Sequence, residues 1–542
     1  MLSYRKLAMR VLGRPLHTGG IDSPRPASQR AAAFILTAAM LTTLAAPAFA
    51  DIWHIENGDI TISAGESGNN VTQNNNTTYG DTNTIITNQN KDTASSNTVT
   101  IETNDKNDTV EVTLKDVNID TSSRNKAAVS VTGEGDTNIK LDGDNALKSD
   151  IYRSGIYGSG SGSLTISGGE NDSLTAQGGS GANGISSSGS LTISGGTVTA
   201  NGDDGGRGIS SSGSVTISGG STVTANGGSG TISGGDGIWS GGGVTISGGS
   251  TVTANGGNGG SLVGGDGIRS GGGLTVSDGT VTAKGGNGDS KDGYGGDGIR
   301  SGGVVTISGN TVNAAGGYGG KVGGYGICSF DRVAISGGTV EAAGGNGSTG
   351  GGSGIYSSVI DLSGSLELTA KAGSPTGKAL LQNGRELDLD TIKDKLGPGA
   401  KVTATDANGD SKQVSIPRPV EPEEPVIPEE SSSSSDGGSA TPSAPVSPLP
   451  GLTVTDKDGQ RISYTSTQSG NTLTVCVGRL TASLHVSLAA LRQLRAEGIE
   501  TITFQTILCS TTLSVDELLA MGGEDAEAVL THRFTDSSLT VG

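Results

Sequence analysis

Apolar and polar residues alternate in short runs along the middle of the chain, and the runs repeat every 24 to 31 residues. Each repeat opens with the pair Gly-Ile and holds three alternating pieces, for example 237–240, 244–247 and 251–254. A period of two predicts a strand with one buried face, and the Gly-Gly and Asn-Gly pairs between the pieces predict turns. The isoleucines that mark the repeat are Ile156, Ile185, Ile209, Ile238, Ile268, Ile299, Ile327 and Ile355.

Three strands and three turns in each repeat predict one coil of a right-handed parallel β-helix, an all-β solenoid. Ile, Val, Leu and Ala then point inward and stack on the same positions of the next coil. Tight corners account for the 95 glycines among the 542 residues. Residues 51–374 contain no proline, as expected where every N–H donates to a ladder. The connections are expected to be short glycine turns, which leaves no loop long enough to build a cleft.

The strand pattern and the composition divide the chain into five segments. The first has an apolar run that ends in Ala48-Phe49-Ala50, which predicts a secretory signal peptide. The second is polar and is either a cap of the solenoid or disordered. The third is the β-helix with its closing cap, the fourth a Pro-, Glu- and Ser-rich flexible linker, and the fifth a small α+β module with two capped helices. The segments are 1–50, 51–97, 98–416, 417–450 and 451–542.

Charge and hydropathy restrict the partners of the exported chain. Its 35 basic and 54 acidic residues give a net charge of −19, and the first fifty residues are basic, so the remainder is more acidic still. Such a chain repels phosphates, which argues against a nucleic-acid partner. No stretch after the signal is apolar enough to span a membrane. The sequence therefore predicts a secreted or cell-surface monomer.

Histidine and cysteine positions limit the chemistry. The only histidines beyond the signal are His54, His485 and His532, so the solenoid has none for a Ser–His or Cys–His nucleophilic pair. Cys476 and Cys509 either form a disulfide within the C-terminal module or remain two free thiols. A third cysteine, in the solenoid, is expected to be a lone thiol on an outward column.

Stacking turns equivalent residues into columns about 4.8 Å apart. The residue after each Gly-Ile pair points outward, because the isoleucine points inward. That column reads Tyr157, Ser186, Ser210, Trp239, Arg269, Arg300, Cys328 and Tyr356. Two positions before the isoleucine stand Asp236, Asp266 and Asp297, on three consecutive coils. The predicted ligand-binding residues Trp239, Arg269, Arg300 and Tyr356 therefore lie beside a row of carboxylates.

This strip has two interpretations. An exposed indole can stack on the C–H face of a sugar, and paired guanidinium groups bind carboxylates or sulfates. Three stacked carboxylates repel one another unless a cation lies between them, which makes the aspartates candidate calcium ligands. Alternatively, each aspartate caps a glycine turn and each arginine neutralises its neighbour on a solvated face.

The repeated units at 189–196 (Gly-Ser-Leu-Thr-Ile-Ser-Gly-Gly) and 242–249 (Gly-Gly-Val-Thr-Ile-Ser-Gly-Gly) resemble a known group of proteins, as does the strand pair at 110–119. They are similar to the exported bacterial parallel β-helix proteins called carbohydrate-binding domain-containing proteins. The resemblance covers roughly residues 98–375. It implies a non-catalytic module that recognises acidic polysaccharide such as pectic chains, with calcium as a possible partner.

Three functions remain open from the sequence. The first is an extracellular, non-enzymatic carbohydrate-binding or adhesin-like β-helix. The second is a polysaccharide lyase or hydrolase, since the same architecture hosts such enzymes; Arg269 or Arg300 beside the aspartates would then serve a lyase. The third is a structural surface spacer without a sugar ligand. The expected absence of a cleft favours a non-enzyme.

Overall fold

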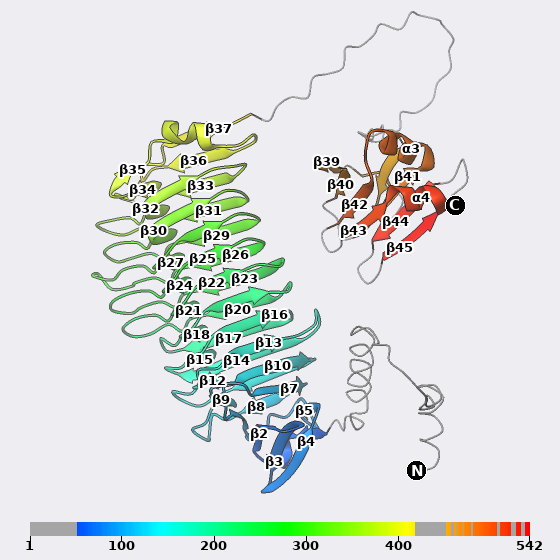
Figure 1. Cartoon of the computed structure of the whole chain (residues 1–542). Helices are drawn as coiled ribbons and strands as arrows, with labels where there is room; N and C mark the ends of the chain where they lie inside the picture. The colour runs from blue at the N-terminus through cyan, green and yellow to red at the C-terminus, as the bar shows by residue number, and fades with distance from the viewer. Residues whose placement is uncertain are drawn as a thin grey trace, which may run out of the picture. The chain divides into compact units, whose positions relative to one another are not determined.

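The computed structural model describes residues 51–417 and, with gaps, residues 451–541 (Figure 1). The predicted signal peptide and nearly all of the predicted linker lie outside the described residues. The chain divides into two compact units, Met1–Pro422 and Glu423–Gly542. The gaps in the second unit are 457–459, 463, 470, 478–480, 507–509, 522–526 and 533–536.

The first unit contains the parallel β-helix that the sequence predicts. Each coil has three strands, and each strand pairs in parallel with its equivalent in the next coil, so that Ile209, Ile238 and Ile268 lie in register. The strands that start at the Gly-Ile position are β6 (Val99–Thr103), β9 (Val129–Gly133), β12 (Ile156–Gly158), β15 (Ile185–Ser187), β18 (Ile209–Ser211), β21 (Ile238–Ser240), β24 (Ile268–Ser270), β27 (Ile299–Ser301), β30 (Ile327–Ile335), β32 (Ile355–Leu362) and β34 (Leu380–Gln382).

The other two strands of each coil form two further ladders. The second position is taken by β7 (Thr109–Lys115), β10 (Asp136–Asp142), β13 (Leu164–Ser167), β16 (Leu191–Ser194), β19 (Val215–Ser218), β22 (Val244–Ile246), β25 (Leu274–Val276), β28 (Val305–Ile307) and the ends of β30 and β32. The third is taken by β8 (Asn118–Asp120), β11 (Asp144–Lys148), β14 (Ser173–Ser180), β17 (Thr197–Asp203), β20 (Thr222–Asn226), β23 (Ser250–Asn255), β26 (Gly279–Lys284), β29 (Thr311–Ala315), β31 (Thr339–Ala343), β33 (Glu367–Lys371) and β36 (Lys401–Thr405). With β37, the third ladder is a 12-stranded sheet.

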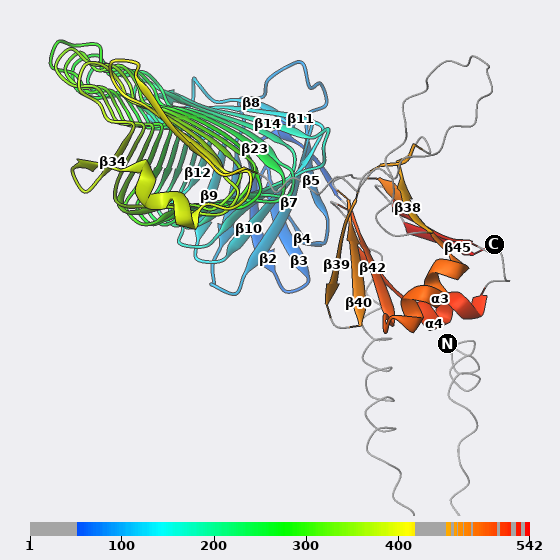
Figure 2. The ribbon, with the colours of Figure 1, turned by 90° about the horizontal axis from the view of Figure 1, so that it is seen from above.

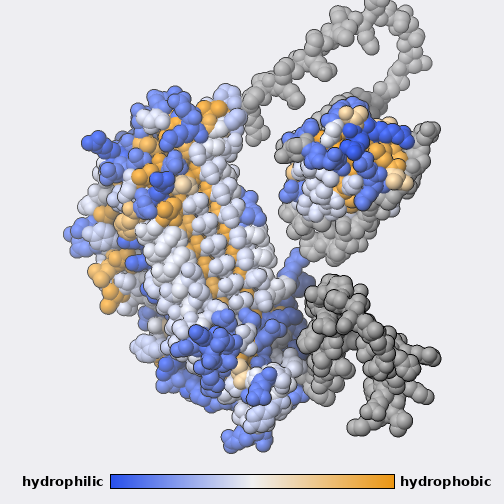
Figure 3. Space-filling view, viewed as in Figure 1, coloured by the Kyte–Doolittle hydropathy of each residue, from blue (hydrophilic) through white to orange (hydrophobic). Residues whose placement is uncertain are grey.

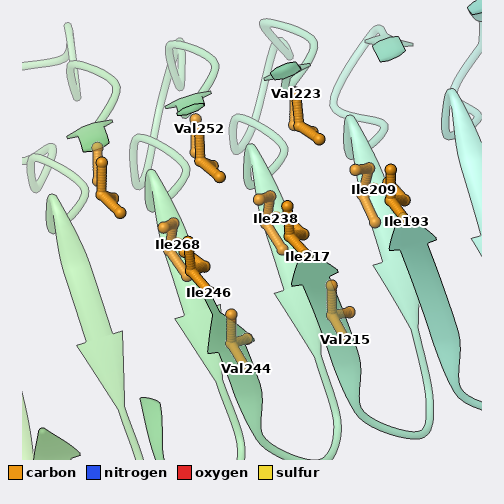
Figure 4. Packing of buried hydrophobic residues seen from close by; sticks show 14 of the residues in the cluster. Ile193, Ile209, Val215, Ile217, Val223, Ile238, Val244, Ile246, Val252 and Ile268 are labelled. Carbon is orange, nitrogen blue, oxygen red and sulfur yellow. The ribbon is translucent and has the colours of Figure 1, made fainter. Parts of the chain in front are cut away.

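The core consists of inward-facing columns of the same residue type. Figure 4 shows Ile238 and Ile268 in one column and Val215 and Val244 in another. All four side chains have at most 1% of their surface exposed. Each buried aliphatic side chain contributes about 1.5–3 kcal/mol, and the branched chains pack well on a pleated surface. The interior is narrow, so aliphatic residues fill it without aromatic ones.

Antiparallel strands and 3-10 helices close both ends of the solenoid. At the N-terminal end, β2, β3 and β4 pair in antiparallel fashion. At the C-terminal end, β37 pairs antiparallel to β36, and η2 forms a short 3-10 helix in the expected closing cap. Such ends cover the sheet edges, which would otherwise pair with another chain. These elements are β1 (Ile52–His54), η1 (Ile55–Asn57), β2 (Ile60–Gly65), β3 (Gly68–Gln73), β4 (Asn76–Asp81), β5 (Thr84–Thr87), β35 (Arg385–Glu386), η2 (Leu389–Lys395) and β37 (Ser411–Ser415).

The prediction that all connections are short turns is wrong. In successive coils the chain leaves the third strand, runs outward, and returns before the next Gly-Ile strand. Figure 2 shows these loops stacked over one another on one side of the coil body. We call the stack the glycine wing; its loops are 204–208, 227–237, 256–267, 285–298, 316–326 and 344–354.

Backbone hydrogen bonds join the outgoing and returning arms of the glycine wing. The N–H of Gly257 donates to the carbonyl of Gly235 in the coil before, at 2.8 Å, and the N–H of Gly265 donates to Gly257 in its own coil, also at 2.8 Å. The N–H of Gly286 then donates to Gly265 at 2.8 Å. Outgoing and returning arms therefore alternate along the axis and satisfy each other's polar groups.

The wing is rich in glycine mainly because backbones of neighbouring arms approach one another closely, and less because the chain turns there. A Cβ atom on Gly265 would lie 1.9 Å from the carbonyl oxygen of Gly235, and one on Gly256 would lie 2.0 Å from that of Gly265. Positive φ is needed at corners of the coil body, where Gly248 and Gly249 have φ of 62° and 71°. The sequence interpretation, which assigned glycine to corners alone, is thereby corrected.

The second unit is a small α+β module, as predicted. Ser487 caps α3 by accepting the N–H of Ala490 at 3.2 Å, and Ser514 accepts the N–H of Glu517 at the start of α4, at 3.4 Å. None of the helices in the described residues is long and apolar enough to cross a bilayer. The elements of the second unit are β38 (Leu452–Thr455), β39 (Thr465–Ser469), β40 (Thr472–Cys476), β41 (Ala482–Ser487), α3 (Leu488–Ala496), β42 (Thr501–Gln505), β43 (Ser510–Ser514), α4 (Val515–Met521), β44 (Glu527–His532) and β45 (Ser537–Val541).

The close packing of the wing predicts an asymmetry between two Gly→Ala substitutions. Gly265→Ala should lower the free energy of unfolding by about 3 kcal/mol, because its methyl group meets a backbone oxygen that cannot move alone. Gly350→Ala, in the same wing, should cost little, since its Cβ would meet only the side chains of Val322, at 3.5 Å, and Thr376, at 3.6 Å. Guanidinium unfolding followed by circular dichroism measures both. Equal effects of the two substitutions would contradict the packing argument.

Candidate functional site

The register places the predicted outward column as expected. Trp239 pairs with Arg269, and Arg269 pairs with Arg300. Arg300 pairs with Cys328, and Cys328 pairs with Tyr356. These residues lie on the first strand of each coil, directly after the chain returns from the glycine wing. The column therefore faces the space beside the wing.

The three aspartates continue the backbone ladder with their side chains. Oδ1 of Asp236 accepts the N–H of Asp266 at 2.9 Å, and Oδ1 of Asp266 accepts the N–H of Asp297 at 2.7 Å. Oδ1 of Asp297 in turn accepts the N–H of Tyr325 at 2.7 Å. The aspartates are only 6%, 5% and 4% exposed, in chain order. Each carboxylate thus has one oxygen committed to the neighbouring coil.

An arginine lies near the second oxygen of each carboxylate. Nη1 of Arg300 is 3.5 Å from Oδ2 of Asp297, and Nη1 of Arg269 is 4.0 Å from Oδ2 of Asp266. Oδ2 of Asp297 is buried and has no hydrogen-bond partner among the described residues. These contacts agree with the second interpretation of the strip, in which each arginine neutralises a neighbouring aspartate.

A third arginine, Arg207, was missed by the sequence interpretation. Its Nε is 3.2 Å from Oδ2 of Asp236. Arg207 precedes Gly208-Ile209, so it occupies the same column as the aspartates, one coil earlier. Extending that column backwards by one repeat would have found it.

Burial controls the acidity of the aspartate row. Desolvation, together with the charges of Asp297 and Asp236, raises the pKa of Asp266 to about 8. Desolvation also raises the pKa of Asp297 to about 6, although the Tyr325 N–H and the charges of Arg300 and Arg269 favour its ionised form. Asp266 and Asp297 therefore hold a proton more readily than exposed carboxylates do.

The aspartates do not converge on a common point. Within the described part of the chain, no group of three or more His, Cys, Asp or Glu side chains could hold a metal ion. One oxygen of each aspartate already accepts a backbone N–H. The calcium site suggested by the column stays a prediction that nothing in this geometry strengthens.

The aromatic members of the column are partly covered. The guanidinium of Arg207 lies 4.5 Å from the ring centroid of Trp239, a cation–π contact on one face of the indole. The ring of Tyr356 stacks on that of Tyr325, with 5.0 Å between centroids. Each ring therefore has one face already in contact with another side chain.

Cys328 is the lone thiol that the sequence predicts, but it is buried although it belongs to the outward column. The residue is 1% exposed, and burial raises the pKa of its thiol to about 12. It lies in register between Arg300 and Tyr356, so its larger neighbours shield a short side chain that points away from the coil interior. Cys476 is a free thiol, with its Sγ 3.5 Å from Oε1 of Gln505, so the disulfide alternative is wrong for it; Cys509 lies outside the described residues.

A groove of about 650 Å³ lies between the glycine wing and the outward column. Arg269 and Arg300 lie on the column side, with side chains 47% and 38% exposed. Neither guanidinium donates a hydrogen bond to any other described residue. The wing side is mostly glycine backbone. The residues that line the groove are Gly181, Asn183, Gly205, Gly206, Arg207, Ser233, Gly234, Gly235, Asp236, Val263, Gly264, Gly265, Asp266, Arg269 and Arg300.

The structure thus brings Arg269, Arg300, Asp236 and Asp266 into one groove, and leaves Tyr356 four coils from Trp239 along the column. Comparison with known proteins adds no relative. No protein-family model, curated protein or solved structure matches the chain. Its function is therefore inferred from the geometry of this groove.

The raised pKa of Asp266 predicts how stability depends on pH. A carboxyl group whose pKa is higher in the folded state stabilises the fold fully below about pH 4, and that contribution is lost as pH rises through the folded pKa. We therefore expect the denaturant concentration at the unfolding midpoint of the β-helix to decrease as the pH rises from 5 to 9. Asp266→Asn should reduce that fall, because it removes the titrating group.

The general acidity of the chain needs a matched control. Asp289→Asn removes one negative charge from an exposed position of the wing. Its pH profile should follow that of the unmodified chain. If both variants shift the profile equally, net charge and not the buried row determines the pH dependence.

Proposed function

We propose that the chain is an exported, non-enzymatic β-helix protein that binds acidic polysaccharide in the groove beside the glycine wing. The observation that carries this proposal is the pair of guanidinium groups of Arg269 and Arg300. They lie on neighbouring coils, in register and half-exposed, with no hydrogen-bond acceptor of their own among the described residues. A guanidinium with unused donors is well suited to a carboxylate or sulfate.

The neighbouring aspartates do not cancel this preference. Their carboxylates are more than nine-tenths buried, and one oxygen of each is engaged by a backbone N–H. A ligand in the groove therefore meets the guanidinium donors of Arg269 and Arg300 before it meets carboxylate oxygens. The raised pKa of Asp266 further reduces the negative charge near the ligand.

The spacing of the arginines fits a repeating ligand. Equivalent residues on adjacent coils are about 4.8 Å apart. Two acidic groups of one polymer can therefore be held by two guanidiniums along the axis of the solenoid. Trp239 lies next to Arg269 in the same column, and Tyr356 lies two coils beyond Arg300; each offers its free ring face to sugar C–H groups.

A lyase is the second candidate, and one observation favours it. The short connections expected from the sequence disfavoured an enzyme, whereas the glycine wing forms one wall of a groove. Arg269 or Arg300 would then act on a bound uronate. The same experiment separates binding from cleavage.

Affinity electrophoresis tests the proposal. The full chain should be retarded in a gel that contains polygalacturonate and should migrate normally in a gel that contains neutral dextran. Arg269→Ala with Arg300→Ala should weaken the retardation by about tenfold for each arginine, the effect of losing a charged hydrogen bond. Running the gels with and without calcium determines whether the metal contributes.

A control variant and two readouts complete the test. Arg332→Ala removes an exposed arginine that lies 3.9 Å from Asp361 and outside the groove, so it should leave binding unchanged. Arg269→Lys should recover only part of the binding, because a lysine keeps the charge and loses the fork. Trp239→Ala should have a smaller effect than the arginine pair. Retardation that survives the double arginine variant would refute the site, and unsaturated products would favour the lyase.

Export is part of the same proposal. It rests on the Ala48-Phe49-Ala50 sequence that follows the apolar run. N-terminal sequencing of the protein recovered from the medium or cell surface of an expressing bacterium should give Asp51 as the first residue. A chain recovered only in the cytoplasm with its first fifty residues intact would contradict it.

A further inference from the structure

Exposed apolar side chains gather along the outer edge of the glycine wing (Figure 3). Ile232 is 60% exposed and Leu262 is 53% exposed, although both are large aliphatic residues. Tyr294 and Tyr318, on the next two loops, are 43% and 47% exposed. Single exposed apolar residues are ordinary, but a contiguous row of them marks an interaction surface. We call the row of Ile232, Leu262 and Tyr294 the apolar edge; Tyr318 lies beside it, on the outgoing arm of the next loop.

Hydrogen bonds between the loops fix the order of the apolar edge. The N–H of Leu262 donates to the carbonyl of Ile232 at 2.9 Å, and the N–H of Tyr294 donates to that of Leu262 at 2.7 Å. The edge therefore consists of neighbours on successive coils and not of residues scattered over a flexible loop. A surface held in this way is preorganised, so that little ordering is needed on binding.

Opposite charges lie at the two ends of the apolar edge. Asp203 is the last residue of β17 and Asp204 the first residue of the wing loop before that of Ile232, and both are exposed. Lys321 lies on the loop after Tyr294, with its ammonium 5.6 Å from the centre of the Tyr294 ring. No ion pair forms between any of these three groups and another described residue. Counted from the loop of Leu262, the acidic and basic ends are each two coils away.

This arrangement is complementary to itself. When two copies lie antiparallel about a two-fold axis through Leu262, Ile232 faces the partner's Tyr294. Asp203 and Asp204 then face the partner's Lys321. In a two-fold interface each such contact occurs twice, so a surface that is acidic, apolar and basic in sequence matches its own reverse. The chemistry of the edge therefore specifies a second copy of the chain as its partner.

We propose that two copies of the chain associate antiparallel through the apolar edges of their glycine wings, with Leu262 at the centre and the acidic end of each copy against the basic end of the other. The proposal goes beyond ligand binding and does not depend on it. It replaces the monomer that the sequence predicts. Since groove residues are not used in the pairing contacts, dimerisation and polysaccharide binding can be tested separately.

Sedimentation velocity of the full chain over a concentration series tests the association. The unmodified chain should shift from monomer to dimer with increasing concentration. Leu262→Lys should raise the dissociation constant by about tenfold or more, because two ammonium groups would meet at the axis. Ile232→Lys should act in the same direction. Ile52→Lys, at a residue that is 59% exposed in the N-terminal cap, is the matched control and should leave the dimer intact.

A charge exchange tests the antiparallel arrangement itself. Asp203→Lys alone should weaken the dimer, since it places like charges beside Lys321 of the partner subunit. The double variant with Asp203→Lys and Lys321→Asp should restore it, and added salt should weaken the unmodified dimer. A chain that stays monomeric throughout, a dimer unaffected by Leu262→Lys, or a double variant no better than the single one overturns the proposal. The proposal is also overturned if the chain is monomeric and co-floats with lipid vesicles, and if Leu262→Lys abolishes that co-flotation.

Discussion

The backbone ladder that joins each coil to the next is the interaction on which the rest of the molecule depends. It holds every residue directly beside its counterpart one repeat away, as the in-register pairing of Ile209, Ile238 and Ile268 shows. A side chain that suits one coil must therefore also suit its own copies. Inside, this favours columns of isoleucine, valine and alanine. Outside, it gathers functional groups from positions about thirty residues apart.

The ladder also explains how much the sequence could reveal. Inward positions are constrained by packing alone, so the Gly-Ile marker was sufficient to predict the β-helix and the outward column. The glycine wing escaped prediction because a Gly-Gly pair fits a tight corner and a close backbone contact equally well. Only the carbonyl of Gly235 lying beside Gly265 distinguishes the two. Burial of Cys328 likewise depends on neighbouring coils, which periodicity alone does not describe.

The groove shows how neighbouring charges of opposite sign can have different tasks. Asp236 and Asp266 complete the hydrogen bonding of the chain itself, since each accepts an N–H from the coil above. Arg269 lies 4.0 Å from Asp266 and Arg300 lies 3.5 Å from Asp297, distances at or beyond the limit of a normal hydrogen bond. The aspartates thus position the arginines, and the guanidinium donors remain available to a ligand. An acidic protein can in this way present cationic donors locally.

The alternation of outgoing and returning arms has a consequence for how such a protein changes over time. Each arm bonds to neighbours that an inserted repeat would supply again, as the chain of contacts through Gly235, Gly257 and Gly265 shows. Recombination between near-identical repeats would therefore lengthen or shorten wing, groove and core together, by one whole unit. Loss of part of a loop would instead leave its neighbours without partners. Variation among related genes should accordingly occur in complete repeats, with coil number as the evolvable quantity.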